Sequence, residues 1–234
     1  MKRNNLMPYL KYKILSKYQI EIISSFSALI SKMESILKTK DFVLKWQEAV
    51  LEPSDAEQET GPDISDLMGA VYDELGLPGK IHSDLEDPTW LEYAHKFLAH
   101  KFKEFSSDFT AAESEDGKMV GYRCIGVALK PFVEKVKKGE VKSTGIYWAW
   151  TEKGADCYWG NKKTEVMLKA LIPLSSIDIE RTLIQNLSPI HSVETEIRVQ
   201  EGSPLELVEI KKKGGDPIKL TPTKISASLS ARRK

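Results

Sequence analysis

The sequence predicts an α+β protein in which a helical N-terminal region is followed by a mixed β-sheet domain. Apolar residues recur at three- and four-residue steps through much of residues 1–112, which is the period of amphipathic helices. After a turn-rich boundary at Glu113–Gly117, short runs of β-branched and aromatic residues indicate strands. We therefore expect a helical accessory or assembly region at 1–112, a sheet domain at 113–211 and a basic, mostly flexible tail at 212–234.

Charge is balanced in this chain of 234 residues, with 34 basic and 34 acidic side chains. No global field therefore recruits nucleic acid or an anionic membrane, and the Lys-rich tail suggests only weak contact with polyanions. Cys124 and Cys157 are the only cysteines and the four histidines are scattered, which predicts neither a disulfide scaffold nor a metal site. Because we find no signal peptide and no run of about 20 apolar residues, we expect a cytoplasmic protein without a membrane partner.

The first helices are predicted from periodicity and from capping residues. Tyr9–Lys38 forms an amphipathic helix with a break near Ser24–Ser25. Asp41–Leu51 forms a shorter helix, with Asp41 as its N-cap. The acidic, proline-bounded segment Glu52–Pro62 is expected to be a solvated linker.

Two further helices follow this linker. Asp63 or Ser65 caps the first of them, which ends at Gly76 because glycine readily adopts the left-handed conformation at a helix terminus. Pro88 lies in the first turn of the second, whose apolar stripe reaches Phe102. We expect no chemistry in either helix.

The sheet domain is predicted as a series of short strands. Arg123 lies in the middle of the first strand, either on an exposed face or in a cleft where its planar donors await an anion. Strands are expected at Lys118–Val127, Lys142–Trp150, Glu165–Pro173, His191–Val199 and Leu205–Ile210, and short helices at Leu129–Lys138 and Thr151–Tyr158.

Aromatic residues gather in the middle of the sheet domain. Two interpretations stay open, because large rings serve equally well in core packing and in a pocket that stacks a flat ligand. The rings belong to Tyr147, Trp148, Trp150, Tyr158 and Trp159.

Two carboxylates are expected on one face of the strand that follows His191. Side chains alternate between the faces of a strand, so Glu194, Glu196 and Arg198 point the same way. Two carboxylates about 7 Å apart repel in a desolvated site, which raises one pKa and suits acid/base work. The alternative is an amphipathic strand whose polar face meets water.

These pieces, taken in order over Met119–Ile210, resemble the ADP-ribosyltransferase superfamily. Tyr122-Arg123 and Glu194-Thr195-Glu196 are similar to the first-strand arginine and the Glu-x-Glu motif of arginine-modifying bacterial toxins. The middle motif, Gly145-Ile146-Tyr147-Trp148-Ala149 with Tyr158 beyond it, is instead closer to the GIYFA segment of the poly-ADP-ribose polymerase and diphtheria-toxin-like branch. The chain therefore looks like a hybrid, and it lacks the toxin Ser-Thr-Ser.

The resemblance implies a toxin-like effector, of a bacterium or a phage, that transfers ADP-ribose from NAD to a protein side chain such as arginine. Glu196 would stabilise the cationic ribose, and Glu194 would orient the acceptor and take its proton. Arg123 would hold the phosphate or ribose side of NAD. Tyr147 would stack on nicotinamide, with Trp148 and Tyr158 as further NAD-binding aromatic residues. No metal is required.

The competing hypothesis is a non-catalytic structural or protein-binding module with a degenerate transferase-like fold. The helical region would then be an assembly module with a protein partner of its own. The missing Ser-Thr-Ser favours this alternative.

Overall fold

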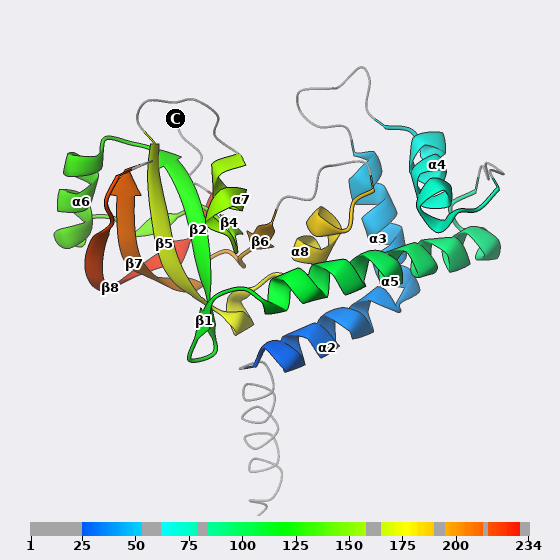
Figure 1. Cartoon of the computed structure of the whole chain (residues 1–234), viewed down its shortest axis with the longest axis horizontal. Coiled ribbons are helices and arrows are strands. Elements are labelled where there is room, and N and C mark those ends of the chain that lie inside the picture. The colour runs from blue at the N-terminus through cyan, green and yellow to red at the C-terminus, as the bar shows by residue number, and fades with distance from the viewer. Residues whose placement is uncertain are drawn as a thin grey trace, which may run out of the picture.

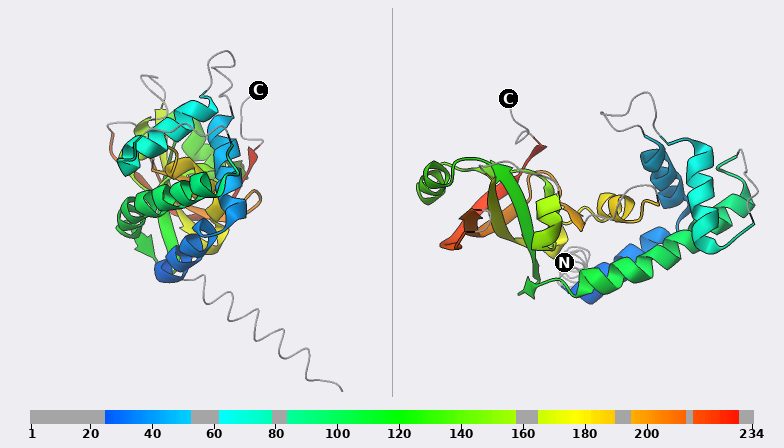
Figure 2. Two further views of the ribbon diagram at one scale, coloured as in Figure 1. Left: turned by 90° about the vertical axis from the view of Figure 1, so that its right-hand side faces the viewer. Right: turned by 45° about the horizontal axis from the view of Figure 1, so that its top comes forward.

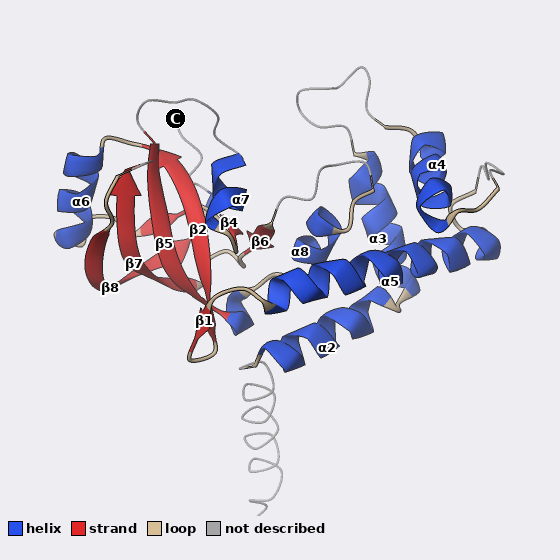
Figure 3. Ribbon diagram, in the orientation of Figure 1, coloured by secondary structure: helices blue, strands red, loops and turns tan. Residues whose placement is uncertain are grey.

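The computed structural model has an α+β fold and describes residues 25–52, 62–78, 84–157, 165–189, 195–212 and 215–229. Helices of the first half gather at one end of the molecule and a curled sheet lies at the other (Figures 1 and 3). The longest helix, α5 (Pro88–Thr110), leads from the helical end toward β1 (Ser114–Glu115), as the turned views in Figure 2 show. The predicted order of helices and then strands is therefore confirmed.

The N-terminal helices begin at hydroxyl caps. Helix α2 (Phe26–Leu37) begins where the break was predicted, since the side chain of Ser25 accepts a hydrogen bond from Ala28 N at 3.2 Å. For α3 (Lys40–Leu51), the predicted cap Asp41 is wrong. The hydroxyl of Thr39 accepts from Phe42 N instead, which places Asp41 inside the first turn.

The two later helices follow their predicted signals. Helix α4 (Ile64–Leu75) has Asp63 as its N-cap, and a reciprocal bond from Asp63 N to Asp66 completes a capping box. It ends at Gly76, whose φ of 64° is left-handed. Asp87 caps α5, with Pro88 as its first residue. The part of the first predicted helix before residue 25 and the linker from 53 to 61 lie outside the described residues.

The sheet is mixed, with strand order β3-β8-β7-β5-β2-β4-β6 and β1 paired to β2. Among the described strands, β3 and β8 run parallel and the other pairs are antiparallel. The strands are β2 (Lys118–Gly126), β3 (Ser143–Thr144), β4 (Tyr147–Ala149), β5 (Glu165–Pro173), β6 (Glu196–Arg198), β7 (Pro204–Lys212) and β8 (Ile218–Ala227). Short helices α6 (Leu129–Lys137), α7 (Glu152–Cys157) and α8 (Ile179–Asn186) and the 3₁₀ turn Leu174–Ser176 connect them.

The predicted flexible tail at 212–234 is wrong for strand β8. This strand pairs with β7 along its length and buries Ile225 and Ala227. Lysines and threonines at its exposed positions conceal the alternation of apolar and polar residues, and Pro222 is atypical of a strand. The structure accommodates this proline where the β7–β8 register shifts.

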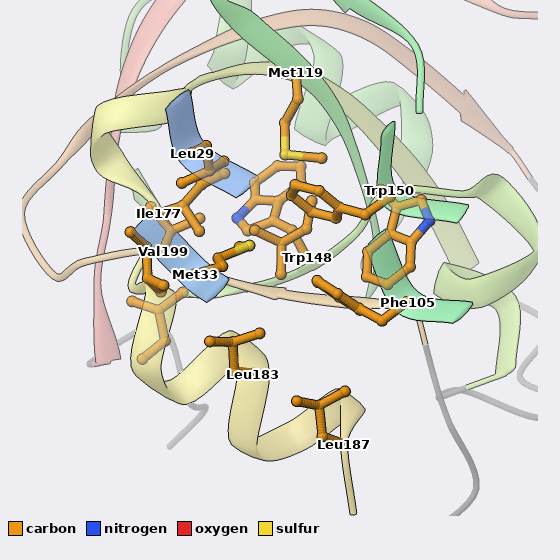
Figure 4. Close-up of a cluster of buried hydrophobic side chains, with 14 of the residues drawn as sticks. Leu29, Met33, Phe105, Met119, Trp148, Trp150, Ile177, Leu183, Leu187 and Val199 are labelled. Atoms are coloured by element: carbon orange, nitrogen blue, oxygen red, sulfur yellow. The ribbon is translucent and has the colours of Figure 1, made fainter. Parts of the chain in front are cut away.

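The larger of two hydrophobic clusters among the described residues runs through both halves of the chain. Rings of Phe105 and Phe109, on α5, meet Trp150 edge-on at centroid distances of 5.6 and 5.3 Å. The indole N–H of Trp46, on α3, donates to the carbonyl of Leu187 at 3.2 Å. Figure 4 shows side chains from α2, α5, α8 and the sheet in this shared cluster. The boundary near residue 112 therefore separates a helical region from a region of mixed helices and strands, and the two regions share this core.

Within the described ranges, no helix combines the length and the apolar character needed to cross a membrane.

Candidate functional site

Three strands from distant parts of the chain place three of the predicted site residues, Arg123, Tyr147 and Glu196, at one edge of the sheet. Strand β4 lies between β2 and β6. Its Ala149 is the register partner of Tyr122 on β2 and of Glu196 on β6. Antiparallel partners place their side chains on the same face of a sheet. The side chains of Tyr122, Ala149 and Glu196 therefore share a face, with the methyl group of Ala149 between the other two.

Arg123 bridges β2 and β4 through its side chain. The β2–β4 backbone pairing consists of the Tyr122–Ala149 pair alone, and one residue later the Arg123 guanidinium donates to the carbonyl of Tyr147. The side chain thus satisfies a strand carbonyl that the backbone ladder does not reach.

Arg123 is half-buried, and not all of its hydrogen-bond donors have a partner. Its Nε is buried without a hydrogen-bond partner in the described structure. Burial lowers the pKa of the guanidinium, while the negative charge of Glu196, and secondarily Tyr147, acts in the opposite direction. An arginine nevertheless stays charged near neutral pH, so this edge carries a cation that is attracted to Glu196.

Gly145 makes room for this cation. A Cβ atom built on Gly145 would overlap the terminal nitrogens of Arg123, and those atoms are its nearest neighbours. The backbone therefore approaches the guanidinium as closely as only glycine allows.

Gly145→Ala is expected to displace the Arg123 guanidinium with little effect on the fold, because the displaced atoms are the end of a flexible side chain. If Arg123 holds NAD, affinity for NAD should fall about tenfold, or about 1.4 kcal/mol. Calorimetric titration with NAD measures this, with thermal unfolding as a check on the fold. Gly69→Ala is the matched control, since a Cβ there meets nothing within 4 Å. Equal NAD affinity in the two variants would show that the position of Arg123 does not matter for binding.

Glu196 is buried, with 5% of its surface exposed. The amide of Asn186 at the end of α8 donates to the carbonyl of Glu196 at 2.8 Å and to that of Thr182 at 2.7 Å. Helix α8 therefore anchors β6 at the residue that carries the carboxylate. Glu194, its predicted partner, lies outside the described residues.

The predicted aromatic residues separate into two environments. Tyr147 is half-buried, and the Cζ of Arg198 lies 3.8 Å from the centroid of its ring. Trp148 is 2% exposed, and its indole N–H donates to the carbonyl of Gly145 at 3.0 Å. For Trp148 the structure corresponds to the core-packing alternative, since its ring lies in the cluster of buried side chains that Figure 4 shows. Tyr158 lies outside the described residues.

Tyr122 extends the polar face of the site away from Glu196. Its hydroxyl donates to Glu113 at 3.2 Å, and Lys169 donates to both oxygens of the same carboxylate at 3.0 Å. Burial raises the pKa of Tyr122, so its hydroxyl stays protonated near neutral pH. Because the Tyr122 hydroxyl already donates to Glu113, this side chain holds the turn of β1 against the sheet.

Two threonines that the sequence analysis missed fix α7 beside the site. The hydroxyls of Thr151 and Thr195 are 2.9 Å apart, and Thr151 also accepts from Gly154 N at 2.9 Å. A Cβ on Gly154 would collide with the Thr195 hydroxyl. These contacts show that α7 packs closely against Thr195, the residue before Glu196. The spacing of residues along the chain did not predict this packing.

Among the described residues, no group of three or more His, Cys, Asp or Glu side chains is placed to hold a metal ion. Comparison with protein-family models, curated proteins and solved structures found no match to the chain.

Proposed function

We propose that this chain is an NAD-dependent mono-ADP-ribosyltransferase that modifies a protein side chain, with arginine as the expected acceptor. The observation that supports the proposal best is the neighbour order β2-β4-β6. Through it, Arg123, Tyr147 and Glu196, which are far apart in sequence, lie on adjacent strands. Tyr147 and Glu196 share one face, and Arg123, which by alternation lies on the other face, donates to the main-chain carbonyl of Tyr147 and is attracted to Glu196. A guanidinium, an aromatic ring and a buried carboxylate are the groups that binding and cleaving NAD would require.

In this proposal the bond from nicotinamide N1 to ribose C1′ breaks, and nicotinamide leaves as a neutral ring. Positive charge that develops on the ribose is stabilised by the carboxylate of Glu196. A nitrogen of the acceptor guanidine then bonds to C1′ and loses a proton to Glu194. Arg123 holds the phosphate or ribose side of NAD, and Tyr147 offers nicotinamide the face that Arg198 does not cover.

One observation favours the non-catalytic alternative. The residue directly across from Glu196 is Ala149, which has no hydroxyl to orient the carboxylate, and the neighbouring Trp148 is committed to the core. Under this alternative the helical region and the sheet, which share one core, form a single binding module.

Two measurements on the purified chain decide between these functions. Incubation with labelled NAD and a cell lysate should place label on a defined protein band. NAD at 100 times its dissociation constant should also stabilise the folded chain by about 2.7 kcal/mol. Thermal stabilisation without transfer would leave a binding module, and the absence of both would remove the proposal.

A further inference from the structure

The described residues of β2, β4 and β6 include more basic than acidic side chains. Arg123, Arg181 and Arg198 are the arginines of the described structure, and of these only Arg181 has an ion pair, with Asp178. Near β4 and β6, Glu196 is the carboxylate that acts electrostatically on Arg123. Strands β2, β4 and β6 therefore hold two half-buried guanidiniums, of Arg123 and Arg198, and one described carboxylate, that of Glu196, an arrangement suited to an anionic ligand.

Arg198 is held in one place by its backbone and by its ring contact. It is the register partner of Tyr147, its N–H donates to the Thr182 hydroxyl at 3.1 Å, and its carbonyl accepts from Asp178 N at 2.8 Å. The guanidinium lies on the Tyr147 ring, with Cζ 3.8 Å from the centroid. A cation held in this way has already lost most of its conformational freedom, so binding through it costs little further entropy.

The donors of this guanidinium are not used up by the stacking. All its N–H groups lie in its own plane, so a ring beneath that plane accepts none of them along its axis. Nε of Arg198 is buried and has no hydrogen-bond partner in the described structure. Stacked arginines with free edges are suited to bidentate recognition of phosphate.

We infer that Arg198 is a specificity-determining residue of the Glu196 site, where it binds a phosphate of the dinucleotide with the edge of its guanidinium. Arg198 and Glu196 are two residues apart on β6, so their side chains lie on the same face of the strand, about 7 Å from each other. In NAD, the diphosphate is joined directly to the ribose whose C1′ would react, so a carboxylate for the ribose and a guanidinium for the phosphate belong on one face. This inference rests on the proposed function for the identity of the ligand.

The test compares Arg198→Gln and Arg198→Lys with the wild-type chain, using ADP-ribose and nicotinamide as separate probes. Arg198→Gln should weaken binding of ADP-ribose about tenfold and leave binding of nicotinamide unchanged or tighter. Arg198→Lys should recover part of the loss, because it keeps the charge without the planar fork. Arg181→Gln is the matched control, since Arg181 is 62% exposed and already paired. The difference between wild type and Arg198→Gln should shrink as salt is raised.

Three results would overturn the inference. Equal affinity of Arg198→Gln and wild type for ADP-ribose would remove the phosphate contact. A parallel loss of nicotinamide affinity would mean that Arg198 acts by supporting Tyr147. Wild-type chain that does not bind ADP-ribose at all would exclude both the inference and the proposed function. By contrast, Arg198-dependent binding of ADP-ribose in a chain that never transfers it would uphold the inference and remove only the transferase.

Discussion

Glu196→Gln is expected to reduce ADP-ribose transfer by roughly 100- to 1000-fold, or more, while the chain remains folded. The substitution keeps the size and shape of the side chain and removes its negative charge, which the developing ribose cation requires. Transfer of label from NAD to protein, at saturating NAD, measures the effect.

The fold should tolerate this change because two contacts that hold β6 in place are made through the backbone of residue 196. Asn186 donates to the carbonyl of residue 196, and Ala149 pairs with it in the ladder, so neither contact depends on the carboxylate. We therefore expect a melting temperature within a few degrees of the wild type. Arg123 would lose the charge that attracts it, and for this reason NAD affinity should be measured alongside transfer.

Glu194→Ala is the informative comparison. If Glu194 deprotonates the acceptor, this variant should still hydrolyse NAD to nicotinamide and ADP-ribose while losing transfer to protein. Equal transferase activity in Glu196→Gln and wild type would remove Glu196 from the catalytic role. Loss of hydrolysis in Glu194→Ala, with the fold intact, would merge the two proposed roles into one.

The parts of the fold that the sequence predicted well are those set by local interactions. Asp63 with its capping box, Gly76 with its left-handed backbone and Asp87 before Pro88 each act within one helical turn. Thr39 took the capping position predicted for Asp41 because both are good N-caps two residues apart, and local preference does not separate them.

Longer-range features could not be obtained this way. Strand β8 forms because it pairs with β7 on one side and with β3 on the other. Its own residues predicted only a basic tail. The same holds for the site. Arg123, Tyr147 and Glu196 were identified as single residues, but their proximity depends on strand order, which is a property of the whole sheet. Arg198 was placed on the face of Glu196 by alternation alone, and its contact with Tyr147 follows from register.

Trp148 is the residue whose expected role changes most between sequence and structure, and Trp148→Ala should destabilise the chain by about 3–5 kcal/mol. Its ring is among the largest fully buried side chains, and it packs close to Gly121, where a Cβ would lie 3.3 Å from it. For a chain of this size, that loss corresponds to a melting temperature lower by roughly 6 to 20 °C. Thermal and urea unfolding measure it.

Trp148→Phe and Tyr147→Ala separate the two roles that a ring can have here. Trp148→Phe keeps most of the packing but leaves the carbonyl of Gly145 without its indole donor, a cost of about 1–3 kcal/mol, and should not change NAD affinity. Tyr147→Ala removes a half-buried ring, so it should cost less stability than Trp148→Ala and should weaken nicotinamide binding. The opposite result, a stable Trp148→Ala chain that no longer binds nicotinamide, would mean that the indole is exposed to ligand. In that case the edge formed by β2, β4 and β6 would have to open on binding, because in the closed sheet the indole has nowhere to meet a ligand.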